Sequence, residues 1–188
     1  NIDHQLHHKR MSSADQLAAT LQVLSLGDSS IAAHVTAEPK VLVPLFESLR
    51  ATASLTGKND GNKVKDALIA FKTLATECMT SAEPFLVDSL TIALMAAGHK
   101  QKFVSVAADE AVKAICAKMS ANSVKESLGH LFKASAVGQP WQSRTLALQV
   151  VATYAESSPE QLSASLPIVV PELTICMGDV KKEVKRSE

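Results

Sequence analysis

Aromatic residues are scarce in this chain of 188 residues, at 4% of the total, with one tryptophan and one tyrosine. Apolar residues of all kinds nevertheless reach 46%, and alanine is abundant, so the chain can bury a sizeable core. Proteins rich in β-sheet usually carry more β-branched and aromatic side chains. The composition therefore favours an all-α protein whose helices pack through small and aliphatic side chains.

Net charge is also absent, because 19 basic and 19 acidic residues leave a formal charge of zero. This balance argues against a protein that binds polyanions with its whole surface, although it leaves local basic patches open. No run approaches the roughly 18 apolar residues that span a bilayer, and no signal-peptide core follows the first residues. We therefore expect no membrane partner and a cytoplasmic location.

Cysteine is rare, and its three occurrences stand far apart at Cys78, Cys116 and Cys176. No two of them form a Cys-x-x-Cys pair, and all three lie in apolar stretches with helical spacing. This arrangement is typical of free, buried thiols in a reducing compartment rather than of disulfides or a metal site.

Sequence signatures of catalysis are missing as well. The stretch TGKNDGNK brings glycine and lysine together without the order of a phosphate-binding loop, and no G-x-S-x-G or H-E-x-x-H motif occurs. Asp109 and Glu110 are adjacent in sequence, so their side chains should diverge on a helix. His34, His99 and His130 are scattered and are interpreted as surface or packing residues. We therefore expect no enzymatic activity, cofactor, metal site or small-molecule substrate for this chain.

Four of the seven glycines, in contrast, recur at a regular interval. Gly57, Gly98, Gly138 and Gly178 are separated by 40 or 41 residues, and each follows a stretch with apolar residues three and four apart. Glycine just beyond a helix end commonly adopts the left-handed conformation that other residues resist. Each glycine is therefore predicted to be left-handed and to mark the turn between the two helices of a repeated pair.

A second set of apolar-periodic stretches follows these glycines, at residues 63–79, 104–119 and 141–157, and residues 180–188 open a fourth. The segments SAEP, SANS and SSPE separate successive pairs; each offers Ser or Asn as a helix cap, and two place proline in a first helical turn. Further prolines fall inside or at the start of the first helices, where they should kink the helix without ending it. These prolines are Pro44, Pro167 and Pro171.

A helix pair that repeats about every 40 residues is typical of the HEAT class, whereas armadillo repeats usually contain three helices. We therefore predict an all-α, HEAT-repeat α-solenoid, a right-handed superhelix of antiparallel helix pairs. A globular four-helix bundle is the alternative, but it does not explain the fixed interval. Residues 1–10 are interpreted as a leader or tag-like tail, and residues 11–188 as a HEAT domain of about four repeats with an N-terminal cap at 13–37, truncated in the last repeat.

Basic residues gather at the predicted turns within repeats, which share one edge of a solenoid, while Glu77, Glu83, Glu156 and Glu160 belong to the opposite edge. Lysine at the start of a helix opposes the helix dipole, so these side chains suit an anionic partner better than they suit helix stability. Plain solubilising charge is the alternative. Trp141, the only tryptophan, opens one of these helices and either packs the turn or anchors a partner. The candidate RNA- or ribosome-binding residues are Lys58, Lys63, Lys65, Lys100, Lys102, Arg144, Lys181, Lys182, Lys185 and Arg186.

The run PWQSRTLALQVVATYAESSPEQLSASLPIVVPELTICMGDVKKEVK, residues 140–185, resembles the N-terminal HEAT domain of the translation elongation factor 3 family. The best matches are the opening Trp141 and Gln142, PELTICMGD and KKEVK, while the leader and the first repeats depart from the family pattern. In this family of ribosome-associated ABC-class ATPases, a helical bundle and two ATP-binding cassettes follow the HEAT domain. The resemblance implies that ATP and Mg²⁺ bind only in such cassettes, whose motifs this chain lacks.

The same resemblance implies a non-catalytic scaffold that binds the ribosome and rRNA and assists translation elongation and exit-site tRNA release. Its partners are then rRNA, ribosomal proteins and other translation factors. One alternative stays open, a HEAT protein–protein adaptor of the karyopherin, phosphatase-scaffold or translational-control regulator type. An adaptor is expected to bind through its inner helical face and to respond little to salt.

Overall fold

The computed structural model describes residues 42–57 and 59–185, and these residues form nine helices without a strand. The all-α prediction is thereby confirmed for the described part of the chain. The predicted leader at 1–10 and the N-terminal cap at 13–37 lie outside the described residues. In chain order the helices are α3 (Leu42–Ala53), α4 (Gly61–Glu77), α5 (Met79–Ala96), α6 (Lys102–Lys118), α7 (Ala121–Ser135), α8 (Trp141–Ser157), α9 (Pro159–Ala164), α10 (Leu166–Met177) and α11 (Lys182–Lys185).

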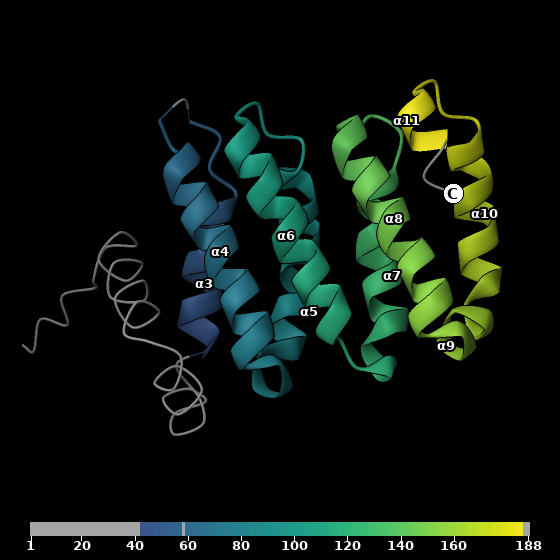
Figure 1. Ribbon diagram of the computed structural model, residues 1–188, viewed down its shortest axis with the longest axis horizontal. Coiled ribbons are helices and arrows are strands. Elements are labelled where there is room, and N and C mark those ends of the chain that lie inside the picture. The colour runs from purple at the N-terminus through teal and green to yellow at the C-terminus, as the bar shows by residue number, and fades with distance from the viewer. Residues whose placement is uncertain (1–41, 58, 186–188) are drawn as a thin grey trace, which may run out of the picture.

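The helices form antiparallel pairs that stack side by side along the molecule (Figure 1). The first helices contact one another, α3 against α5 and α5 against α7, and α4 packs closely on α6 in the layer of second helices. The second helices begin at Gly61, Lys102, Trp141 and Lys182, at intervals of 39 to 41 residues. The repeat interval and the α-solenoid predicted from the glycines are therefore confirmed.

Apolar spacing explains why these segments are helical and how they pack. In α4 the buried residues Val64, Leu68 and Phe71 recur at intervals of four and three, so one face of the helix turns to the core. Phe46 of α3 stacks on Phe71 and on Phe85 of α5, with ring centroids 6.1 and 5.2 Å apart. This aromatic cluster joins the first described repeat to the second.

The turn glycines lie at the predicted positions, but not all of them adopt the predicted left-handed conformation. Gly57, Gly98, Gly138 and Gly178 each lie between the two helices of a pair, but Gly138, with a φ of 99°, is the only described glycine with positive φ. The left-handed prediction is wrong for the other three. At Gly98 the requirement is space, because an added Cβ would clash with the side chain of Pro140 in the next repeat. Glycine at this position lets the third repeat approach the second.

The reversals between repeats differ from the prediction at one place. Cys78 alone joins α4 to α5, and the predicted SAEP separator lies inside α5 instead. Pro84 there removes one intrahelical hydrogen-bond donor without ending the helix, so the predicted separator is wrong. The other two separators lie between helices as predicted, with Ser120 and Ser158 at the N-cap positions of α7 and α9, but neither side chain caps its helix with a hydrogen bond.

The first helix of the fourth repeat is divided rather than kinked. α9 ends at Ala164 and α10 begins at Leu166, with Ser165 between them. Pro167 lies in the first turn of α10, where a missing N–H costs nothing, whereas in a continuous helix it could not donate to the carbonyl of Ser163 and its ring would clash with that carbonyl. The prediction of a continuous, kinked helix is wrong at this point, although α10 does continue through Pro171.

Candidate nucleic-acid interface

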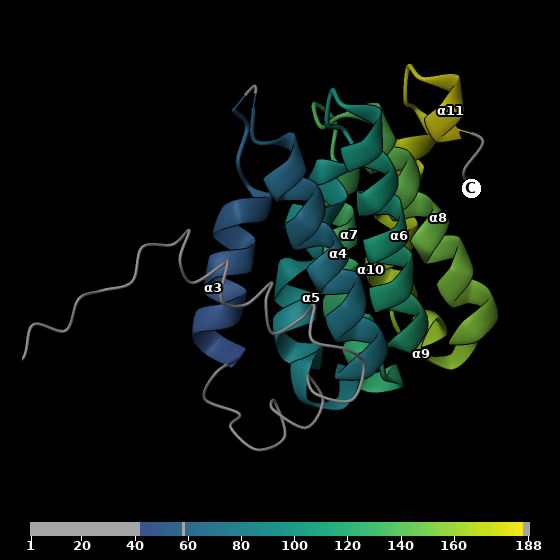
Figure 2. The same cartoon turned by 60° about the vertical axis from the view of Figure 1, so that its left-hand side comes forward.

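The turns inside the repeats lie along a single edge of the stack. Figure 1 shows the connections α3–α4, α5–α6, α7–α8 and α10–α11 at the top of the view, and Figure 2 shows them at the same edge after a 60° rotation. The connections between repeats lie at the opposite edge (Figure 1). The alignment on which the predicted basic edge depends is therefore present, and individual side chains decide which charges are available there.

The first two described repeats contribute four lysines to this edge. Two of them are offset by neighbouring acids, since Lys63 Nζ lies 3.2 Å from a carboxylate oxygen of Asp60 and Lys65 Nζ lies 3.8 Å from one of Asp66. The other two are exposed and form no ion pair with any described residue. We term these four residues the first lysine cluster: Lys63, Lys65, Lys100 and Lys102.

Arg144 does not belong to the exposed edge. It lies in the first turn of α8 and is 7% exposed, where its guanidinium forms a buried ion pair with the carboxylate of Asp179. The second carboxylate oxygen of Asp179 accepts a hydrogen bond from the main-chain N–H of Lys181 at 2.7 Å. The assignment of Arg144 to RNA binding is therefore wrong, because this side chain joins the third repeat to the fourth.

The last turn carries three further exposed lysines around α11, none of which pairs with a carboxylate of the described residues. We term them the second lysine cluster: Lys181, Lys182 and Lys185. Two other predicted contacts, Lys58 and Arg186, lie outside the described residues, as does His34.

The third turn separates the two lysine clusters and presents apolar rather than basic side chains. Val137 is 77% exposed, and Trp141 keeps 38% of its surface exposed at the start of α8. With Arg144 buried, no basic side chain reaches the surface between residues 136 and 145. The predicted continuous basic edge is thus two lysine clusters with an apolar turn between them.

Acidic side chains occupy the opposite edge of the stack. Glu83 there accepts a hydrogen bond from the main-chain N–H of Ser120 at 2.7 Å, which joins α5 to the start of α7. Partial burial raises the pKa of Glu83, but hydrogen bonds from Ser120 and Ser123 outweigh this effect and lower the pKa overall. The residues predicted for this edge lie at or near helix ends beside the connections between repeats: Glu77, Glu83, Glu156 and Glu160.

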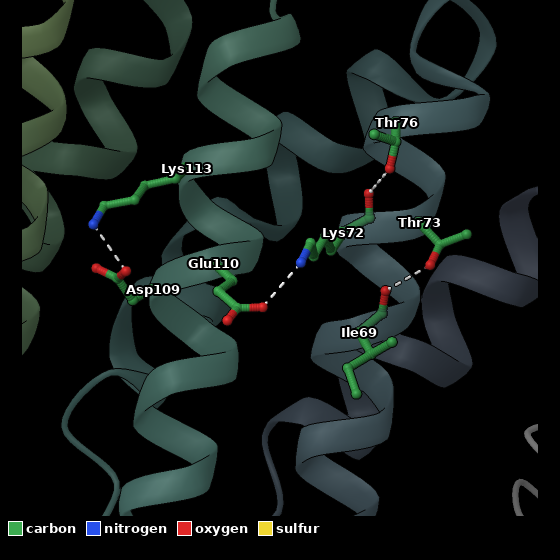
Figure 3. Close-up of polar contacts among 7 residues, drawn as sticks. All are labelled: Ile69, Lys72, Thr73, Thr76, Asp109, Glu110 and Lys113. Atoms are coloured by element: carbon green, nitrogen blue, oxygen red, sulfur yellow. Dashed lines mark hydrogen bonds and ion pairs between the residues drawn. The ribbon is translucent and has the colours of Figure 1, made fainter.

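Charges on the face formed by α4 and α6 are paired. Lys72 Nζ lies 2.9 Å from a carboxylate oxygen of Glu110 in the next repeat, and Lys113 Nζ lies 2.8 Å from one of Asp109. Figure 3 shows both ion pairs. Asp109 and Glu110 therefore point to different partners, as their adjacency in sequence predicts. Because both lysines already have carboxylate partners, this part of the face is poorly suited to binding phosphate.

Other polar and nucleophilic groups serve packing. The three cysteines form no disulfide and are buried, as predicted, and burial raises the pKa of Cys116 to about 11 against a smaller lowering by Tyr154. His130 Nδ1 lies 2.9 Å from Thr91 Oγ1, and His99 Nδ1 accepts a main-chain hydrogen bond. Among the described residues, no three His, Cys, Asp or Glu side chains gather as a metal site, and no helix is long and apolar enough to cross a membrane.

Comparison with known proteins identifies a family for this chain. The family model described as the EF3 N-terminal HEAT repeat matches residues 14–187. Elongation factor 3 of Candida albicans is 30% identical over 162 residues, which cover 85% of this chain and 15% of that protein. Elongation factor 3 of Gonapodya prolifera is 26% identical over 180 residues, which cover 95% of this chain and 15% of that protein.

A further relative is the stalled ribosome sensor GCN1 of Homo sapiens, 30% identical over 136 residues, which cover 72% of this chain and 5% of that protein. The chain therefore spans between 5% and 15% of the length of these three relatives. No solved structure matches it. Because the family model covers nearly the whole sequence and the described helices pair and stack at the expected interval, the chain belongs to the family of elongation factor 3 N-terminal HEAT-repeat domains.

Proposed function

We propose that this chain is a non-catalytic scaffold that docks on the ribosome and contacts rRNA phosphates chiefly through those members of its two lysine clusters that have no carboxylate partner among the described residues. Within a longer protein of the elongation factor 3 type, the scaffold assists translation elongation and the release of deacylated tRNA from the exit site. Its partners are rRNA, ribosomal proteins and other translation factors of the cytoplasm. ATP and Mg²⁺ belong to other domains of that longer protein.

The observation that carries this proposal is the set of exposed lysines without carboxylate partners on one edge. Lys100 and Lys102 stand at the second turn and the second lysine cluster at the fourth, with no ion pair to the described residues. Lys102 is the first residue of α6, where its charge opposes the helix dipole. A lysine that destabilises its own helix and has no carboxylate partner is available to bind an anion of another molecule.

Phosphate contacts of this kind require positive charge at suitable spacing more than they require a shaped pocket. A rigid stack of helix pairs holds its turns at fixed separations, so two lysine clusters can reach two backbone segments of a folded RNA. The names of the relatives, elongation factor 3 and stalled ribosome sensor, support a role on the ribosome.

Binding to purified ribosomal subunits across a salt series tests the proposal. We expect Lys100→Glu with Lys102→Glu to weaken binding at low salt and to lower the slope of log affinity against log salt by about two, since each lost phosphate contact removes about one. Triple reversal of Lys181, Lys182 and Lys185 should weaken binding in the same way. The matched control is Lys118→Glu with Lys125→Glu, which changes net charge equally at the opposite edge.

Equal losses in the edge and control variants would show that bulk charge, not the lysine clusters, governs binding. Unchanged binding of the edge variants at low salt would reject the assignment of phosphate contacts. Tight binding that does not depend on salt concentration would instead favour the adaptor interpretation, in which a helical face binds a protein.

A further inference from the structure

A cavity of about 840 Å³ lies between the first and second described repeats, on the edge that carries the first lysine cluster. It is formed by the loop at 54–57, the second half of α5 and the turn at 98–101. We propose that this cavity binds an extended acidic segment of a partner protein, with one apolar side chain of that segment inside it. The proposal does not depend on the ribosomal role.

Apolar groups dominate the lining of the cavity. Leu55, Val64, Ile92 and Met95 supply most of its larger side chains, from both repeats. Leu55 is 36% exposed, so a large apolar side chain faces water when the cavity is empty. Cavities of several hundred cubic ångströms with an apolar lining and a few polar groups are typical ligand sites. The volume accommodates a leucine-sized side chain together with its main chain.

Two polar side chains at this cavity, Lys100 and His99, can bind a negatively charged group. Lys100 lies at the rim, exposed and without an ion pair among the described residues. His99 Nδ1 accepts the main-chain N–H of Gln101 at 3.1 Å, which leaves the neutral ring to carry its proton on Nε2 as a donor. No described Asp or Glu lines the cavity, and Asp60 beside Gly57 is engaged by Lys63.

The loops around the cavity also offer main-chain groups. Among the described residues, neither the N–H nor the C=O of Thr56 has a hydrogen-bond partner, and the same holds for Lys100. These two residues come from adjacent repeats and both line the cavity. An extended peptide can satisfy such groups with its own main chain, as peptides do on exposed strand edges.

RNA fits this cavity less well than peptide does. Sequence-tolerant RNA sites stack bases on aromatic side chains, and none of the residues that line the cavity is Phe, Tyr or Trp. An apolar lining gives a phosphate group nothing to bind. An apolar side chain beside a carboxylate matches both the lining and the rim at once.

Fluorescence polarisation with short capped peptides tests this inference on the purified chain. The probe carries two leucines flanked by aspartates; one control peptide has serines for the leucines and another has lysines for the aspartates. We expect the acidic leucine peptide to bind at least about tenfold more tightly than the serine control, because burial of a leucine alone is worth that factor. The lysine control keeps the leucines and should be weaker by a smaller factor, because the charge at the rim is exposed to solvent.

The place of binding is read from the methionine methyl signals in NMR spectra. Met95 lines the cavity, whereas Met177 is 60% exposed on α10, so the two report on different apolar surfaces. We expect the peptide to shift the Met95 signal and to leave Met177 unchanged. A shift confined to Met177 would overturn the inference, because the peptide would then be bound to the outer face of α10.

Two exposed residues and their matched controls complete the test. We expect Leu55→Glu to weaken peptide binding about tenfold or more and Lys100→Glu to weaken it by a smaller factor. Val43→Glu, at an apolar residue of similar exposure away from the cavity, and Lys125→Glu should both bind as the parent chain does. Wild-type affinity in Leu55→Glu, or equal affinity for all three peptides, would reject the peptide site.

Discussion

The guanidinium of Arg144 lies where the third repeat meets the fourth, and its only charged partner among the described residues is the buried carboxylate of Asp179. Burying two charges is costly, and the pair holds only because each partner compensates the other. We expect Arg144→Met to destabilise the junction by about 3–5 kcal/mol, the usual cost of leaving one buried charge uncompensated. Urea unfolding, with hydrogen exchange of α10 and α11, measures the loss.

The double variant Arg144→Met with Asp179→Leu is the matched control for this prediction. Removing both charges should recover part of the lost stability, because no unpaired charge then remains buried. The opposite pattern would reverse our interpretation of this residue. If Arg144→Met left stability unchanged but lowered the salt slope of ribosome binding, Arg144 would be a phosphate contact after all.

The same residue shows where sequence reasoning stops at this scale. The sequence places Arg144 next to a predicted turn, and its charge there predicts an exposed contact. What it cannot give is the carboxylate 35 residues later that folds against it, because the partner belongs to another repeat. The carboxylate of Asp179 both accepts the Lys181 N–H and pairs with Arg144.

At the scale of the helix pair, the turn between α5 and α6 is tightly fitted to the repeat that follows it. An added Cβ at Gly98 would clash with Pro140, whereas nothing lies within 4 Å of a Cβ added at Gly129 on the exposed side of α7. We expect Gly98→Ala to lower the free energy of unfolding by about 1–3 kcal/mol through overpacking. Thermal unfolding of the two alanine variants measures the difference.

Gly129→Ala is the control, and it should raise stability by about 0.5–1 kcal/mol because alanine is the better helix former in open space. If both glycine variants were equally stable, the contact between Gly98 and Pro140 would not limit how closely the second and third repeats approach.

Helix pairs could be predicted from the sequence because the signal is local and repeated. The glycine interval and the three-and-four apolar spacing located α4, α6 and α8. The predicted helix boundaries were wrong at prolines, because a proline either stays inside a helix or interrupts it, depending on how the helix packs. Helix α5 continues past Pro84, whereas the first helix of the fourth repeat is interrupted at Ser165, two residues before Pro167. Local sequence does not distinguish these cases, since helices of neighbouring repeats decide which one is stable.

Across the whole molecule, burial is distributed unevenly along the stack. One continuous apolar core runs from Leu42 to Val169, and a separate small cluster of Leu148, Cys176 and Val184 joins the last turn to α8. α4 packs closely on α6, whereas α6 and α8 touch only marginally and stand further apart in Figure 1. Solenoid repeats are stabilised by their neighbours, so a repeat with little shared core is the least stable part.

The candidate sites depend on how the repeats stack, and this determines which of them could be predicted from the sequence. Alignment of the turns follows from the repeat alone, so the lysine clusters could be predicted. The cavity could not, because its lining comes from side chains of two repeats, such as Leu55 and Ile92, that no local pattern brings together. From apolar spacing alone, both residues would be assigned to the core rather than to the lining of a cavity.

The uneven stack predicts the order in which its thiols react. All three cysteines are buried, but α9 buries no residue and α10 buries only Val169 and Cys176, so the fourth repeat should open most often. Cys116 sits in the central core, where burial raises its pKa to about 11, and reaction requires the thiolate.

We therefore expect Cys176 to be modified first by a thiol reagent under native, mildly alkaline conditions and Cys116 last, with Cys78 between them. Peptide mass spectrometry at successive times gives the three rates, and the same experiment in concentrated urea should bring them close together because local burial is then lost. Comparable native rates at Cys176 and Cys116 would mean that the second and fourth repeats open as one unit. Stability would then be shared along the whole stack, and the small cluster at Leu148 would couple the last repeat as strongly as the main core couples the others.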